Sequence, residues 1–76
     1  MTQLSKVQNY ITQKNYLEAL RIVTKFPKIK GNADLIKTTY EILIYPQFYK
    51  QLYKDINAQI QKGIDELITV YGVESL

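Results

Sequence analysis

The strongest constraint on the fold is a helical repeat of apolar residues near the end of the chain, in residues 55–72. These apolar residues recur mostly at intervals of three and four: Ile56, Ile60, Ile64, Leu67, Ile68 and Tyr71. At ~100° per residue, this spacing places them on one face of an α-helix. Asp55 and Asn57 offer capping oxygens at the start of this helix, and Gly72 stands where a left-handed C-cap belongs. Because a stripe of this length must be covered, we expect the rest of the chain to pack against it.

Shorter repeats with the same period run through the rest of the sequence. Together they predict helices at about 3–13, 16–26, 33–44, 46–53 and 56–71, followed by a frayed tail at 73–76. The first two breaks fall at Lys14-Asn15 and at Pro27, because Asn tolerates turns and Pro ends helices. No stretch alternates apolar and polar residues long enough to predict a strand. We therefore expect an all-α fold, with residues 1–76 forming a single domain, a compact bundle of four to five short helices.

Three features predict details of the packing. The apolar residues of 33–44 spread over about half of the helix circumference, which is typical of a helix packed from two sides, so we expect this helix to be central. Asn32 and either Thr2 or Ser5 are predicted N-caps, in addition to Asp55. Gly63 costs a helix up to ~1 kcal/mol relative to Ala, and a close approach of two helix backbones would account for it.

The residue types exclude several classes of function. The chain of 76 residues has no Cys and no His, so it cannot form disulfides and lacks the usual ligands of zinc and haem. The longest apolar run, residues 42–45, is far shorter than the ~20 residues that span a bilayer. The N-terminus lacks the apolar segment of a signal peptide. The sequence predicts a cytoplasmic protein with no cofactor, no metal and no membrane partner.

No arrangement typical of catalysis is present. Asp65 and Glu66 are adjacent, so on a helix they diverge by about 100° and cannot act as a catalytic carboxylate pair. We expect both to be solvated. The Ser and Thr residues have no His to activate them. We therefore expect a protein that is not an enzyme and has no catalytic residues.

An aromatic cluster is the most distinctive local feature, and it has three interpretations. Its members lie within two helical turns: Tyr45, Phe48, Tyr49 and Tyr53. Tyr45, Tyr49 and Tyr53 are a candidate protein interface, because Tyr brings a large contact area at low entropic cost. With Lys50 and Lys54 interleaved, the rings are alternatively suited to stack nucleobases. The third interpretation, the most common for aromatic residues at helical spacing, is that Phe48, Tyr49 and Leu52 fill the core while Tyr45 and Tyr53 close its edge.

Charge is distributed unevenly along the chain. Residues 1–30 hold six basic residues against one acidic residue, whereas residues 31–76 hold four against six. The basic half includes a candidate polyanion-binding run: Arg21, Lys25, Lys28 and Lys30. Such a run suits phosphates or an acidic protein. The alternative is a solvated face that keeps a small protein soluble.

Several short motifs, taken in order, resemble a group of small proteins encoded by prophages. The motifs are Lys25-Phe26-Pro27, Pro46, Phe48-Tyr49-Lys50-Gln51-Leu52, Lys54-Asp55, Gly63-Ile64 and Tyr71-Gly72. Tyr53 departs from the pattern, which has Gly at that position. The resemblance covers most of the chain and implies an origin in a phage or prophage. It implies no mechanism, because the group has no assigned activity.

These observations lead to one leading expectation and two alternatives. The leading expectation is a small phage-encoded helical module, located in the host cytoplasm, that binds another protein. A component of host defence, or of phage replication or packaging, would be a plausible partner. The first alternative is an accessory protein that binds nucleic acid through the basic half of the chain. The second is a structural homo-oligomer such as a homodimer, formed because the last helix carries more apolar surface than one protomer covers.

Overall fold

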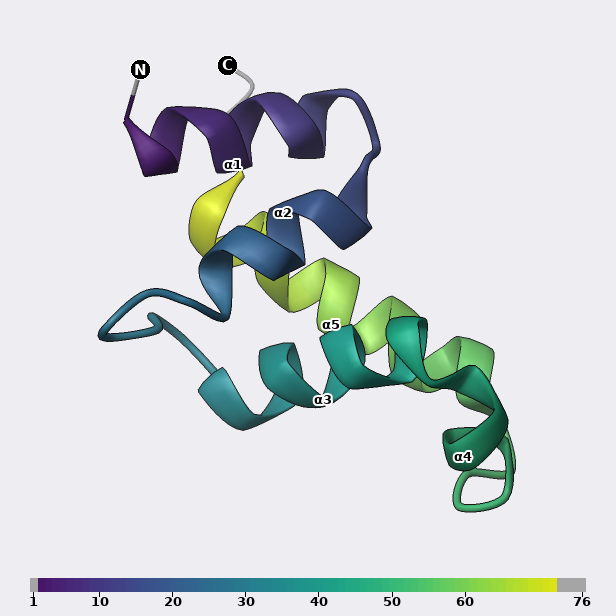
Figure 1. Cartoon of the computed structure of the whole chain (residues 1–76). Coiled ribbons are helices and arrows are strands. Elements are labelled where there is room, and N and C mark those ends of the chain that lie inside the picture. Colours follow the sequence, from purple (N-terminus) through teal and green to yellow (C-terminus); the bar gives the residue numbers. More distant parts are fainter. Residues whose placement is uncertain (1, 73–76) are drawn as a thin grey trace.

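The structure, a computed structural model, describes residues 2–72 and consists of five α-helices in that range (Figure 1). The helices are α1 (Gln3–Thr12), α2 (Tyr16–Val23), α3 (Ala33–Ile44), α4 (Pro46–Lys50) and α5 (Ile56–Tyr71). The described residues contain no strand. The Cα radius of gyration is 12.2 Å, close to the ~11 Å of a compact chain of this length. The predicted all-α bundle of short helices is confirmed, whereas the predicted tail at 73–76 lies outside the described residues.

The helices form two antiparallel pairs that stack on each other. α1 and α2 make a hairpin, and α3 and α5 run side by side in opposite directions (Figure 1). α2 packs on α3, and the last turns of α5 reach α1. α4 projects from the end of α3 and packs on that helix (Figure 1). α3 therefore contacts α2, α4 and α5, as its wide apolar surface predicts.

The hydrophobic core lies between the hairpin and the α3–α5 pair. Its buried members come from four helices: Val7, Ile11, Ala19, Leu20, Val23, Ile36, Leu67 and Tyr71. One polar side chain, Thr39, is also fully buried, and its hydroxyl donates to the Leu35 carbonyl oxygen at 2.8 Å. That bond satisfies the hydroxyl inside α3, which removes the cost of burying it. α4 places no side chain in this core.

Side-chain caps begin three of the helices, where the sequence predicts them. The Thr2 hydroxyl accepts from the Ser5 N–H at 3.0 Å, and the Asn32 side chain accepts from the Leu35 N–H at 3.1 Å. The Asp55 carboxylate accepts from the Ala58 N–H at 3.0 Å. Each cap satisfies an N–H group that the first turn of a helix leaves without a partner. These bonds fix where α1, α3 and α5 begin.

Gly63 lies at a close contact between helices, as the sequence predicts, but the contact is with a side chain and not with a second backbone. Gly63 is buried where α5 crosses α3, directly against the Thr39 side chain. A Cβ atom at Gly63 would overlap the Oγ1, Cβ and Cγ2 atoms of Thr39. The absence of a side chain therefore allows α3 and α5 to pack at this distance.

Some predicted helix ends are wrong by one to three residues. α1 ends at Thr12, α2 ends at Val23 instead of residue 26, and α4 ends at Lys50 instead of residue 53. After α2 the backbone tightens, because the N–H groups of Lys25 and Phe26 donate to carbonyls only three residues back. A tighter final turn of this kind is common at helix ends.

Two backbone conformations also differ from the prediction. In the turn between α1 and α2 the left-handed residue is Lys14, with φ 62°, and not Asn15. Gly72 ends α5 as predicted, but with φ −64° and ψ 154° it is extended and not left-handed. Gly31, in the loop before α3, is the glycine with a left-handed φ, 72°.

Candidate protein interface

The apolar side chains on and after α4 face solvent. Tyr45 is 62% exposed, Phe48 is 61% exposed and Leu52 is 62% exposed. The interpretation in which Phe48 and Leu52 fill the core is therefore wrong. The physical reason is the position of α4, which is five residues long, lies at the end of the bundle and does not reach the core (Figure 1).

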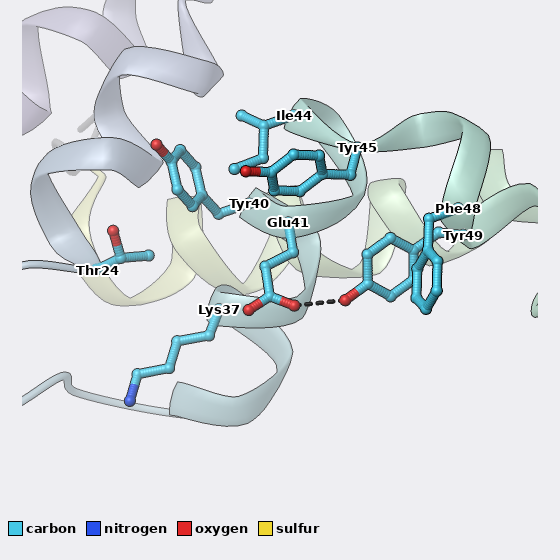
Figure 2. A pocket seen from close by; sticks show the side chains of 8 residues that line it. All are labelled: Thr24, Lys37, Tyr40, Glu41, Ile44, Tyr45, Phe48 and Tyr49. Carbon is cyan, nitrogen blue, oxygen red and sulfur yellow. Dashed lines mark hydrogen bonds between the residues drawn. The ribbon is translucent and has the colours of Figure 1, made fainter.

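These exposed rings border a groove between α2, α3 and α4, with a volume of about 650 Å³. Its lining residues are Thr24, Lys37, Tyr40, Glu41, Ile44, Tyr45, Phe48 and Tyr49. α3 supplies four of them, α4 supplies Phe48 and Tyr49, and Thr24 comes from the end of α2 (Figure 2). The groove is thus an apolar concave surface with a few polar groups, the usual character of a binding site.

One hydrogen bond holds α4 against α3 within this groove. The Tyr49 hydroxyl donates to the Glu41 carboxylate (Figure 2). This bond is the main reason why the pKa of the Tyr49 phenol lies above its ordinary value, with smaller contributions from burial and from the charges of Glu41 and Tyr53. Tyr49 therefore remains a protonated donor at neutral pH, and Glu41 is its acceptor.

The rings around Tyr49 fix its orientation further. Phe48 packs edge-on against it, with centroids 5.0 Å apart and planes at 85°. Tyr53 stacks on it at 6.1 Å and 22°. Such pairs add about 0.5–1.5 kcal/mol beyond the area they bury. Phe48, Tyr49 and Tyr53 therefore form one continuous set of ring contacts.

Two of the three predicted interface tyrosines line the groove, and the third does not. Tyr45 and Tyr49 both line the groove, whereas Tyr53 supports Tyr49 and is not a lining residue. Phe48, which only one of the three interpretations places in the core, is an exposed lining residue.

The floor of the groove, on α3, was not predicted, although the sequence contains a signal for it. Tyr40 and Ile44 are four residues apart, on the same side of α3 and about 60° away from the direction of the buried Ile36. Tyr40 and Ile44 belong to the second apolar side of α3, the helix that the sequence predicts to be packed from two sides. In the structure α2 and α4 cover this side only in part, and the uncovered part is the groove.

The predicted polyanion-binding residues are exposed, but one of them already has a partner. The Arg21 guanidinium forms an ion pair with Glu18, with 3.0 Å between Nη1 and Oε2. Lys25, Lys28 and Lys30 are also exposed, in the segment that leads to α3. Arg21 would have to leave its carboxylate partner before it could contact a phosphate, so the run offers less free positive charge than its sequence indicates.

The loop that carries Lys28 and Lys30 is fixed to α5 by two hydrogen bonds. The Lys30 N–H donates to the Tyr71 hydroxyl at 2.9 Å, and the Asn32 N–H donates to the Glu66 carboxylate at 2.9 Å. The prediction that Glu66 is simply solvated is therefore wrong. Its partner is 34 residues away in sequence, so no local pattern identifies this role.

Three comparisons bear on identity and chemistry. No known family, curated protein or solved structure gives a significant match to this chain. Within residues 2–72, no three acidic side chains gather into a group that could hold a metal ion. In the same range, no helix is both long enough and apolar enough to cross a membrane. Because none of these comparisons gives a match, the resemblance to prophage proteins remains a prediction.

Proposed function

We propose that this protein is a non-enzymatic helical module that binds another protein through the groove between α3 and α4. The observation that carries the proposal is the exposure of Tyr45 and Phe48, each more than 60% accessible, beside a concave apolar surface. Aromatic residues at the centre of an interface supply much of its binding energy. If the predicted prophage origin is correct, the partner is a protein of the host or of the phage.

The free energy that would be gained by covering the exposed rings supports a role in binding. Phe and Tyr side chains bury ~150–250 Å² each when they are covered. Burial of apolar area contributes about 25 cal/mol per Å². Covering the exposed parts of Tyr45 and Phe48 would therefore contribute several kcal/mol in gross terms, from which the cost of association is subtracted. The edge-on contact of Phe48 with Tyr49 lowers that cost, because it already restricts the Phe48 side chain.

Capture experiments with three forms of the protein test the proposal. The wild-type chain, Phe48→Ala and Leu4→Ala are immobilised and exposed to a lysate of the cell in which the protein acts. Leu4, on α1, is 45% exposed and does not line the groove, so it is a matched control for the loss of an exposed apolar side chain. We expect one partner to be retained by the wild type and Leu4→Ala and lost with Phe48→Ala. Identical sets of captured proteins for all three would contradict the proposal.

A salt titration distinguishes the proposal from nucleic-acid binding. If Arg21, Lys25, Lys28 and Lys30 contacted duplex phosphates, log K would fall with log salt with a slope of about −3 to −4. A surface of apolar rings has a much weaker dependence on salt. Duplex DNA is the probe, and tight binding with the steep slope would favour the alternative.

A further inference from the structure

The charges at the groove suggest which chemistry a partner presents. Lys37 and Glu41 are the charged residues in the lining. Glu41 accepts the Tyr49 hydroxyl, whereas the exposed Lys37 side chain extends away from Glu41 (Figure 2). Among residues 2–72 the one ion pair is that of Arg21 with Glu18, so Lys37 has no carboxylate within 4.0 Å. The groove therefore has one cation that is available to a partner.

The free cation and the exposed rings lie at opposite ends of the groove. Lys37 and Ile44 share one face of α3 and are about 10 Å apart along the axis, at ~1.5 Å per residue. Tyr45 and Phe48 stand beyond Ile44, at the α4 end (Figure 2). A ligand that fits both ends must carry a bulky apolar group and, about 10 Å away, a negative charge.

We propose that the groove binds a short segment of a different protein, with an aromatic or leucine side chain at the Tyr45–Phe48 end and an Asp or Glu at Lys37. In a helical segment the two side chains would be about seven residues apart, the spacing by which amphipathic helices bind grooves. In an extended segment they would be about three residues apart. This inference rests on the proposed function and specifies the class of partner.

A second copy of the chain fits the groove less well. At ~150–250 Å² for a whole aromatic side chain, the exposed parts of Tyr45 and Phe48, 62% and 61% of each residue, come to roughly 200–300 Å². A stable dimer interface buries about 800 Å² on each partner. The exposed area therefore favours a short segment of another protein over a second copy.

Selection from a library of random twelve-residue peptides tests this inference. The full-length wild type, Lys37→Glu, Phe48→Ala and a charge-matched control, Lys6→Glu on α1, are used as separate targets. We expect the wild type and the control to enrich peptides that combine an aromatic or leucine residue with Asp or Glu at one of the two spacings. Those peptides should bind Lys37→Glu about three- to tenfold more weakly, the scale of an exposed ion pair that is reversed. Selection on Lys37→Glu should enrich peptides that have Lys or Arg in place of the Asp or Glu.

The outcomes separate this inference from the function on which it rests. Peptides that need Phe48 but bind wild type and Lys37→Glu equally would overturn the acidic partner and leave the groove as an interface. Failure to select any peptide that depends on Phe48 would overturn the proposed function as well. Self-association at micromolar concentration that Phe48→Ala abolishes would assign the groove to a second copy and contradict the inference.

Discussion

The two ends of the bundle place their apolar side chains in opposite environments. At the end formed by α1, α2 and the last turns of α5, Leu20, Val23 and Leu67 are fully buried. At the end formed by α4, Tyr45, Phe48 and Leu52 are more than 60% exposed. Both ends carry apolar side chains at helical spacing, so the difference in burial arises from what lies opposite each helix. The first end holds the fold together, whereas the second is free to bind another molecule.

The largest expected difference between the two ends is in stability. Leu20→Ala removes a fully buried side chain, and we expect it to lower the free energy of unfolding by about 2–5 kcal/mol. Phe48→Ala truncates an exposed side chain and removes its edge-on contact with the Tyr49 ring, so it should lower the same quantity by no more than about 1.5 kcal/mol. Urea unfolding followed by circular dichroism measures both. A loss with Phe48→Ala comparable to that with Leu20→Ala would show that α4 belongs to the core.

The crossing of α3 and α5 connects the two ends and is expected to be the next most sensitive point. Gly63→Ala introduces a Cβ that overlaps Thr39, so we expect a loss of about 1–3 kcal/mol despite the higher helix propensity of Ala. Lys62→Ala, at an exposed neighbouring position, is the control and should lie within about 0.5 kcal/mol of wild type. If Gly63→Ala were as stable as Lys62→Ala, the close approach would be ruled out.

The loop before α3 is held to the core end by Glu66. Glu66→Ala removes the acceptor of the Asn32 N–H, and we expect a loss of about 0.5–1.5 kcal/mol. Glu66→Gln keeps an acceptor oxygen at the same distance along the side chain and should recover part of that loss. Amide hydrogen exchange at Asn32 should be faster in Glu66→Ala than in Glu66→Gln. Equal exchange in both variants would mean that the carboxylate does not hold the loop.

The smallest expected effect concerns the bond between Tyr49 and Glu41. Because the folded state raises the pKa of this phenol above its ordinary value of 10.0, the bond stabilises the protein fully below pH 10 and is lost as the pH rises through the folded-state pKa. Tyr49→Phe lacks the hydroxyl and should show no such loss. The difference between the free energies of unfolding of the two proteins should therefore be constant below pH 10 and shrink as the pH rises above 10. A difference that is independent of pH would contradict the proposed role of the bond.

The sequence predicts those features that depend on local physics. The periodicity identifies all five helices, Asn32 and Asp55 are recognisable as caps, and Gly63 reveals a close helix crossing. The sequence cannot show whether a helix face has a neighbour, since periodicity only tells which residues share that face. Phe48 and Leu52 have the pattern of core residues, and only the position of α4 at the end of the bundle leaves them exposed. Glu66 was missed for a related reason, because its partner is distant in sequence.

Affinity and stability measured together on Phe48→Ala test the central claim most directly. The partner captured by the wild-type protein is titrated against wild type and Phe48→Ala by calorimetry, and the free energy of unfolding of each is determined in parallel. We expect binding to weaken at least tenfold, as for a central aromatic residue of an interface, while the free energy of unfolding falls by no more than about 1.5 kcal/mol. Equal affinities for the partner would contradict the assignment of the groove between α3 and α4 as the binding surface.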